Sequence, residues 1–169
     1  MTGCSRDDAE QLIRSIAAYP RIVVAFSGGV DSGVVAAAAQ RARGQHAVAV
    51  TADSPSVPRW QLAWARRVAG EIGIRHRIIA TDEIRRSDYR RNDPERCFFC
   101  KQSLYAALET VAREYPLARI LSGTNADDLG DHRPGIRAGE LADVLTPLAD
   151  LGFGKPAVRS LARHWGLSN

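Results

Sequence analysis

The order of elements in this sequence predicts an α/β fold, a doubly wound sheet of parallel strands. Short apolar runs typical of buried strands alternate with longer helical stretches about once every 25 to 40 residues. Two glycine-containing loops directly follow such runs, at the sheet edge where doubly wound folds bind their ligands. A length of 169 residues with 45% apolar residues indicates one domain with its own core.

Predicted strands and helices account for most of the chain. We expect strands at residues 21–26, 46–51, 75–80 and 119–122. We expect helices at residues 7–18, 32–43, 58–72, 100–115, 138–143 and 156–165. Acidic residues open the first helix, Gly44 and Gly73 close the next two, and Pro156 begins the last. The polar, arginine-rich residues 82–98 are interpreted as a loop.

The charge of the chain favours a small anionic ligand. Lysine and arginine number 23 against 19 acidic residues, which gives a net charge of +4 and a pI near 9.3. A mild positive excess suits a nucleotide, whereas the arginines are too dispersed to predict binding of RNA or DNA. No window of about 20 apolar residues exists, so no membrane span is predicted. The polar N-terminus is unlike a signal peptide, and we expect a cytoplasmic protein.

The stretch SGGVDS, residues 27–32, follows a predicted strand and opens a helix. Gly28 and Gly29 allow backbone conformations that turn successive N–H groups into one concavity, to which the helix N-terminus adds its own. Ser27 and Ser32 can donate hydroxyl hydrogen bonds to the same anion, and Asp31 can cap the helix or help to hold Mg²⁺. We therefore predict phosphate binding, with a tight turn without ligand as the alternative. Neither the Walker A pattern nor GxGxxG is present.

This hexad resembles the signature of the PP-loop ATP pyrophosphatases, which have the fold of the adenine-nucleotide alpha-hydrolases. Such enzymes cleave ATP between the α and β phosphates, adenylate an oxygen of the substrate, and let a nucleophile displace AMP. The resemblance implies that ATP and its pyrophosphate bind at Ser27, Gly28, Gly29, Val30, Asp31 and Ser32. The second strand of the family meets adenine, which implies that Thr51, Ala52 and Asp53 lie at the base, with Thr51 and Asp53 as further ATP-binding residues. Asp53 is equally well explained as a polar loop residue.

A second polar loop, SGTNADDLGDHRPG at residues 122–135, also follows a predicted strand. Three aspartates within five residues repel one another unless a cation or a helix N-terminus compensates. Asp127 and Asp128 are therefore candidates for Mg²⁺ binding or for orienting the substrate. Arg133 and Arg137 are candidates for holding an acidic substrate. The alternative is a glycine-rich loop with solvated charges.

The stretch RCFFCK, residues 96–101, contains a CxxC pair. Cys97 and Cys100 have the spacing of a zinc or iron–sulfur half-site, but two ligands do not complete a site. Redox chemistry and simple burial ahead of a helix are the alternatives. A helix N-terminus and the neighbouring Arg96 and Lys101 would lower the pKa of a thiol here.

Together these stretches resemble the ATP-dependent sacrificial sulfur transferases of the LarE type. The segment LGFGKPAVRSLARHWGL resembles the family pattern KxxVRxLAxxxGL, and the likeness covers residues 8–168. It implies adenylation of a carboxylate of a pyridinium dicarboxylate mononucleotide, then sulfur delivery, in the synthesis of the nickel-pincer nucleotide cofactor. It implies catalytic roles for Asp31, Asp127 and Asp128, and ATP binding by Gly123 and Thr124. The implied substrate-binding residues are Asn125, Asp131, Arg133, Arg137 and Lys101.

The sulfur source differs within that family. Some members use a single cysteine, and others hold a [4Fe-4S] cluster with three cysteines, of which Cys97 and Cys100 match the CxxC pair. The third would follow the last residue of this sequence, and Cys4 does not match its position. We therefore expect residues 1–169 to form a single PP-loop ATP-pyrophosphatase domain without the C-terminal sulfur-transfer portion of the family.

Two other functions fit the same residues. One is a different PP-loop enzyme, either an amide-forming synthetase of the NAD or GMP type or a tRNA thiolase. The other is an ATP-binding module without turnover. Related enzymes are commonly oligomeric, so a homo-oligomer is expected. Trp60 and Trp64 lie one helical turn apart and are interpreted as core residues, with an exposed apolar patch as the alternative.

Overall fold

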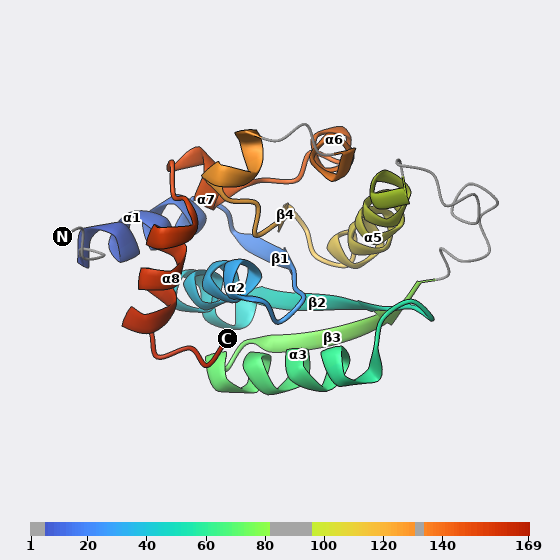
Figure 1. The fold of residues 1–169 in the computed structure, drawn as a ribbon, viewed down its shortest axis with the longest axis horizontal. Helices are drawn as coiled ribbons and strands as arrows, with labels where there is room; N and C mark the ends of the chain where they lie inside the picture. Colours follow the sequence, from blue (N-terminus) through green and yellow to red (C-terminus); the bar gives the residue numbers. More distant parts are fainter. Residues whose placement is uncertain (1–5, 82–95, 131–133) are drawn as a thin grey trace.

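A parallel sheet of four strands forms the centre of the protein (Figure 1). The computed structural model describes residues 6–81, 96–130 and 134–169. The strand order is β3-β2-β1-β4. The strands are β1 (Arg21–Ala25), β2 (Ala47–Asp53), β3 (Arg75–Ala80) and β4 (Ala118–Leu121). This arrangement confirms the predicted doubly wound α/β fold.

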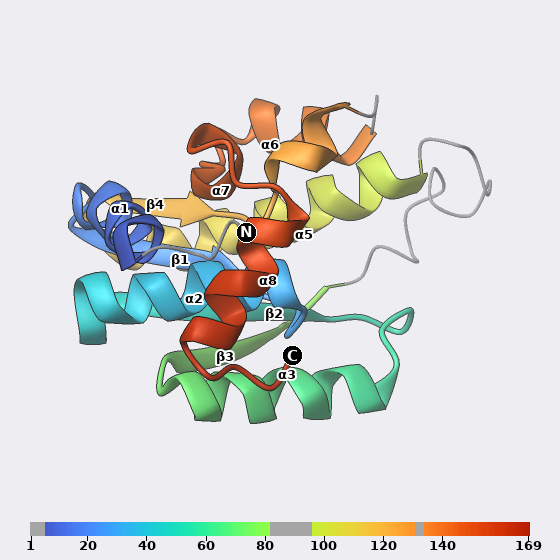
Figure 2. The ribbon, with the colours of Figure 1, turned by 60° about the vertical axis from the view of Figure 1, so that its left-hand side comes forward.

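Helices cover both faces of the sheet (Figures 1 and 2). One face packs against α1 (Arg6–Ala17), α2 (Val30–Arg43), α3 (Arg59–Ile72), α7 (Pro147–Asp150) and α8 (Lys155–His164). The other face packs against α5 (Arg96–Ala112) and α6 (Pro134–Leu141). Two short 3-10 helices complete the described elements, η1 (Gly44–His46) and η3 (Ala126–Gly130). In the described part of the chain, no helix is long and apolar enough to cross a membrane.

The central strand β1 shows why the strands are apolar on both sides. Ile22 and Val24 belong to the core on the α2 side, while Val23 between them belongs to the core on the α5 side. Side chains alternate between the faces of a strand, so a strand covered on both faces is apolar throughout. All three side chains are at most 1% exposed.

Helix α2 is buried along most of its length. Its residues from Ser32 to Ala39 are all buried, because α2 lies on the sheet while α1 and α8 cover its outer side. A helix with apolar residues on every side is typical of such an enclosed position. The run of four alanines, residues 36–39, lets these neighbours approach closely. The N-terminus of α2 is therefore fixed relative to the end of β1.

Three features differ from the sequence-based predictions. Helix α5 begins at Arg96 rather than at Cys100, because nothing in the stretch RCFFCK breaks a helix. The short α7 and η3 were not predicted, since each has too few residues to show a periodic pattern. Trp60 is 70% exposed and is not a core residue, whereas Trp64 packs against the core. The loop predicted at residues 82–98 lies outside the described residues up to 95.

We expect Leu161→Ala in α8 to lower the free energy of unfolding by about 2 to 5 kcal/mol. Leu161 is 0% exposed and belongs to the core that joins α8 to α2. Urea denaturation measures the change, and Arg163→Ala on the exposed side of the same helix is the control. A loss below about 1 kcal/mol would show that α8 is not part of the cooperative core.

Candidate functional site

A cavity of about 370 Å³ opens at the carboxyl ends of the strands. Residues at or just after the end of each strand line it, as the doubly wound fold predicts. Helices α3 and α5 complete the wall. Representative lining residues are Ala25 at the end of β1, Ala52 in β2, Thr81 after β3, Ser122 after β4, Gln61 in α3 and Leu104 in α5.

The loop between β1 and α2 presents polar groups to this cavity. Gly28 has a φ of +81°, a conformation that favours glycine. Ser27 and Ser32 both line the cavity, and their hydroxyl oxygens lie 3.1 Å apart. The Ser27 hydroxyl also accepts a hydrogen bond of 3.2 Å from the N–H of Gly29. Gly29 is the N-cap of α2 and provides no side-chain cap, so the first N–H groups of the helix can bind an anion.

The loop after β4 lies directly against the first turn of α2. A methyl group at Gly123 would lie 2.6 Å from the backbone nitrogen of Ser32 and 2.9 Å from the carbonyl carbon of Asp31. Any side chain at residue 123 would therefore push the two loops apart. Gly123 and Thr124 line the same cavity as Ser27 and Ser32, so the structure brings both predicted phosphate-binding loops together.

Asp31 and Asp128 form a pair of carboxylates on the cavity wall. The pKa of Asp31 is raised, first because burial disfavours its charge and then because Asp128 repels it. Asn125, Lys155 and Arg159 act in the opposite direction and lower this pKa. Two neighbouring carboxylates, one of them half-buried, are suited to a cation that removes their repulsion.

Asn125 shapes the turn that carries Asp128. Its side chain is 0% exposed, and its Oδ1 accepts hydrogen bonds from the N–H groups of Asp127 at 2.9 Å and Asp128 at 3.2 Å. The Asp128 carboxylate in turn accepts the N–H of Asn125 at 3.2 Å. Within the described residues, Nδ2 of Asn125 has no partner at hydrogen-bond distance, although the amide favours the charged form of Asp31. Asn125 does not line the cavity, so the structure does not bring this predicted substrate-binding residue to it.

The structure places Asp127 away from the cavity, at the N-terminus of α8. Its Oδ2 accepts the backbone N–H of Lys155 at 2.7 Å, and a methyl group at Gly154 would lie 2.8 Å from both carboxylate oxygens. A carboxylate at this position satisfies an unpaired N–H group and the helix dipole. The geometry therefore gives Asp127 a capping contact with α8, while its catalytic and Mg²⁺-binding roles stay predictions. The sequence predicts that a cation or a helix N-terminus offsets the repulsion among the aspartates. For Asp127, the N-terminus of α8 does so.

The residues predicted at adenine are engaged elsewhere. The Thr51 hydroxyl is 2.7 Å from the carbonyl oxygen of Phe26, to which it donates, and 2.8 Å from Nε2 of His76. Asp53 forms an ion pair with Arg59, with contacts of 2.5 and 3.1 Å, and this hydrogen bond lowers the pKa of Asp53. Neither residue lines the cavity, whereas Ala52 between them does. Asp53 is the last residue of β2, paired with Ala80 of β3, so it is a strand residue rather than the polar loop residue of the alternative interpretation.

Lys101 and Cys100 contribute to the α5 side of the cavity. Lys101 is exposed, with its Nζ 5.8 Å from the centre of the Tyr105 ring, and Cys100 is half-buried. Arg137 lies on α6, exposed and outside the cavity wall. Among the described residues, no group of three or more His, Cys, Asp or Glu side chains could hold a metal ion. The predicted residues Asp131 and Arg133, and the side chain of Cys97, lie outside the described part of the chain.

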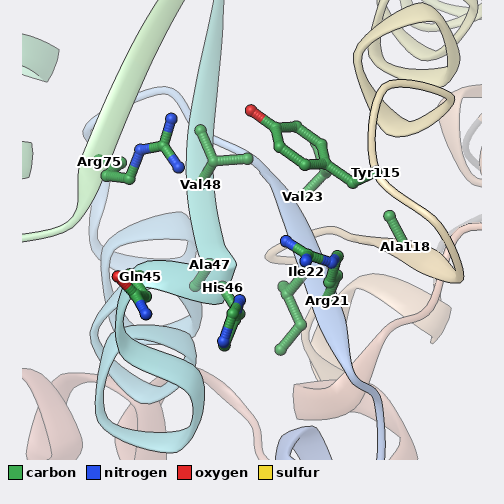
Figure 3. A pocket seen from close by; sticks show the side chains of 10 residues that line it. All are labelled: Arg21, Ile22, Val23, Gln45, His46, Ala47, Val48, Arg75, Tyr115 and Ala118. Carbon is green, nitrogen blue, oxygen red and sulfur yellow. The ribbon is translucent and has the colours of Figure 1, made fainter.

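A second, much smaller cavity lies at the opposite, amino end of the sheet (Figure 3). Its volume of about 10 Å³ has room for about one water molecule. Arg21, His46 and Arg75 lie around it without a carboxylate among the lining residues. This cavity is too small for a nucleotide. A third hollow, of about 490 Å³ near the end of α5 and the start of β4, contains none of the residues predicted to bind ATP. The cavity at the carboxyl ends of the strands contains several of them and is therefore the candidate site.

A family model described as asparagine synthase matches residues 10–129. The chain belongs to this family of PP-loop ATP pyrophosphatases. The matched residues include β1, the SGGVDS loop, β4 and most of the loop that carries Asp128. The family predicted from the hexad is therefore confirmed, and its members are enzymes that use ATP.

Two proteins are similar in sequence to almost the whole of this chain. The protein slr1717 of Synechocystis sp. is 39% identical over 158 residues, which are 94% of this chain and 59% of that protein. The pyridinium-3,5-bisthiocarboxylic acid mononucleotide synthase of Lactiplantibacillus plantarum is 31% identical over 159 residues, which are 94% of this chain and 58% of that protein. The chain thus spans less than two thirds of the length of these relatives.

A solved structure confirms the fold. The NH3-dependent NAD synthetase of Campylobacter jejuni superposes with a TM-score of 0.78 over 96% of this chain and 74% of its own. At 19% identity, this likeness concerns the arrangement of strands and helices alone.

We expect Asp127→Ala to lower the free energy of unfolding by about 1 kcal/mol, since the variant lacks the cap of α8. Thermal or urea denaturation measures this effect. The replacement Asp127→Asn keeps an acceptor oxygen and should retain part of the stability. An unchanged stability in Asp127→Ala would contradict the capping role.

We expect Asp31→Asn to be more stable than the wild type at pH 7. Because the pKa of Asp31 is raised above its ordinary value of 3.8, the folded protein holds this proton more tightly than the unfolded chain does. The free energy of unfolding therefore falls as the pH rises from that ordinary value through the raised one. The melting temperatures of variant and wild type should converge below this window, and Asp7→Asn on exposed α1 should show no such gain. If Asp31→Asn were more stable than the wild type by the same amount at every pH, the raised pKa of Asp31 would not be the cause.

Proposed function

We propose that this protein uses ATP to adenylate a carboxylate of a small nucleotide substrate and releases pyrophosphate. One observation carries the proposal: the N-terminus of α2, two serine hydroxyls and the pair formed by Asp31 and Asp128 line one cavity. Donors for a polyphosphate and ligands for its cation thus lie side by side. The family supports the use of ATP and Mg²⁺.

The loop at residues 27–32 stabilises the leaving group. Backbone N–H groups at a helix N-terminus, with the hydroxyls of Ser27 and Ser32, bind the oxygens of the β and γ phosphates. These donors are already in place before the reaction, so they stabilise the negative charge that develops on pyrophosphate as the bond to the α phosphate breaks. Gly123 keeps the loop after β4 close enough for Thr124 to contribute to the same wall.

The donor set of Asp31 and Asp128 fits Mg²⁺, which proteins commonly hold with one or two carboxylates, waters and substrate phosphates. When bound, Mg²⁺ supplies positive charge next to the phosphate oxygens. Asp31 and Asp128 would hold the ion at the cavity wall, beside the loop that would bind the polyphosphate. Asn125 supports this arrangement by fixing the turn that carries Asp128.

The apolar part of the cavity suits the adenine base. Ala52, Val57 and Leu104 lie on its wall, on the β2 and α5 sides of the phosphate-binding loops. A base held among these side chains buries its apolar surface away from water, while the ribose faces the loops. This proposal replaces Thr51 and Asp53 as the residues next to adenine.

The finer proposal is sulfur transfer of the LarE type to a pyridinium dicarboxylate mononucleotide, in the synthesis of the nickel-pincer cofactor. The relative from Lactiplantibacillus plantarum supports this acceptor by its name, and three motifs of the chain resemble the same group. Cys100 and Lys101 lie on the cavity wall, where an acceptor carboxylate would meet the α phosphate. A homo-oligomer, a cytoplasmic location and the domain limits 1–169 remain predictions.

The described residues do not support a [4Fe-4S] cluster. Cys100 is the one cysteine whose side chain they include, and no group of three metal-binding side chains is present among them. We therefore assign no step to a cluster. Amide formation of the NAD or GMP synthetase type, or ATP binding without turnover, would use the same ATP end of the cavity.

Pyrophosphate release decides between these functions. We expect this protein, incubated with ATP, Mg²⁺ and pyridinium-3,5-dicarboxylic acid mononucleotide, to release pyrophosphate and to form AMP or an adenylated acid. Deamido-NAD and xanthosine monophosphate with ammonia are the comparison acceptors. Asp128→Asn should reduce release on the order of a hundredfold. Pyrophosphate release with only deamido-NAD or xanthosine monophosphate would contradict the proposed sulfur transfer. ATP binding without pyrophosphate release for any acceptor would indicate an ATP-binding module without turnover.

A further inference from the structure

Two side chains outside the cavity hold the backbone of the phosphate-binding loop. Trp64 of α3 donates from Nε1 to the carbonyl oxygen of Gly28 at 3.1 Å. Asn169 donates from Nδ2 to the same oxygen at 3.1 Å and to the carbonyl oxygen of Gly29 at 3.0 Å. Neither side chain lines the nucleotide cavity, and no motif of the sequence contains either residue.

These hydrogen bonds determine which way the loop's N–H groups face. In a trans peptide the C=O group and the following N–H group point in opposite directions, and no described peptide is cis. Holding the Gly28 oxygen toward α3 therefore turns the N–H of Gly29 away from α3, where it donates to Ser27 Oγ at 3.2 Å. The Gly29 oxygen also accepts the N–H of Gly33 at 2.8 Å and the Ser32 hydroxyl at 3.2 Å, and Asn169 adds a third donor from outside α2. Together these donors set the N–H of Val30, the first residue of α2.

The loop needs such a restraint because of its glycines. Gly28 and Gly29 have many backbone conformations available, so a free loop would present its N–H groups in several directions. Ordering them at the moment of binding would cost free energy that a loop already held in place does not lose. A restraint on the two carbonyl groups reduces this cost without occupying the cavity.

We propose that Trp64 and Asn169 are positioning residues that orient the peptide groups of residues 28–30 to bind the pyrophosphate part of ATP. This inference rests on the proposed use of ATP by the same site. It adds two residues that contact the loop from behind and touch no part of the nucleotide.

The packing around the loop agrees with this role. A methyl group at Gly28 would lie 2.9 Å from Cα of Ala65, so the loop lies directly on α3. A methyl group at Gly33 would overlap Nδ2 of Asn169, so this amide lies equally close to α2. The segment after α8 ends between α2 and α3 (Figure 1), and Ser168 fixes it there by donating to Glu71 at 2.5 Å.

The Asn169 amide is oriented as a donor at some cost. Its Oδ1 is buried and has no hydrogen-bond partner among the described residues. A buried acceptor without a partner is unfavourable, and the two hydrogen bonds from Nδ2 offset that cost. Of the two polar atoms of the Asn169 amide, only Nδ2 can donate to the carbonyl oxygens of Gly28 and Gly29, so the contact with the loop sets the orientation of the amide.

The test measures how Trp64→Phe and Asn169→Ala bind the two halves of ATP. Inhibition of pyrophosphate release by added pyrophosphate and by AMP gives the affinity for each half separately. Each variant should raise the KM for ATP and the inhibition constant of pyrophosphate by about threefold to tenfold, the effect of one net hydrogen bond. The inhibition constant of AMP should not change, because AMP does not reach the loop's full set of N–H groups.

Matched controls separate this role from general damage. Trp60→Phe changes an exposed tryptophan one turn earlier on α3, and Arg163→Ala changes an exposed residue of α8, before the segment that carries Asn169. Both controls should keep the wild-type affinity for pyrophosphate. Gly33→Ala should displace the Asn169 amide and weaken pyrophosphate binding like Asn169→Ala. The double variant that combines Gly33→Ala with Asn169→Ala should then bind pyrophosphate no more weakly than either single variant, because both changes remove the same contact.

Two results would overturn the inference. One is an unchanged affinity for pyrophosphate in Trp64→Phe and Asn169→Ala while the wild type binds it. The other is an equal loss of affinity for AMP and pyrophosphate, which indicates a merely structural effect. If the wild type binds neither ATP nor pyrophosphate, the proposed function fails first, so the two failures are distinguishable.

Discussion

The contact between Gly123 and the first turn of α2 is the constraint on which the site depends. It joins two loops that are about 90 residues apart in the sequence, and it leaves no space for a side chain. Because α2 is buried between the sheet and α1 and α8, its first turn cannot move aside to relieve a clash. The rigid core thus holds the loops after β1 and β4 in place, although these loops have few side chains that could hold them.

The same wall holds two carboxylates that repel each other. Asp31 and Asp128 face one cavity, and burial and repulsion by Asp128 both raise the pKa of Asp31. Asn125, Lys155 and Arg159 lower this pKa and so reduce the effect. A carboxyl group with a perturbed pKa on a cavity wall is common at functional sites. Under the proposed function, Mg²⁺ with the triphosphate would be a positive partner for this pair.

Much of the fold could be predicted from the sequence, because apolar runs and glycine or proline boundaries lie within a few residues of the observed strands and helices. The position of the loop between β1 and α2 on a cavity wall was also predictable, since SGGVDS combines two glycines, two hydroxyls and a helix N-terminus directly after a strand. The separate roles of Asp127 and Asp128 were not. They depend on where α8 begins in space, 28 residues further along the chain, and on a single hydrogen bond to Lys155. Trp64 and Asn169 could not be predicted because they act on backbone carbonyls, which leave no pattern in the sequence.

The structure also separates what the family shares from what distinguishes its members. The ATP end of the cavity consists of backbone N–H groups, small hydroxyl residues and two carboxylates, all of which serve amide formation and sulfur transfer equally well. Specificity for the acceptor must therefore come from the part of the wall that lies beyond the α phosphate. Under the proposed function, that part is the face of α5 with Cys100 and Lys101, an exposed cation beside a thiol. A cation there attracts an acidic acceptor, and a nearby thiol is a group that amide formation does not require.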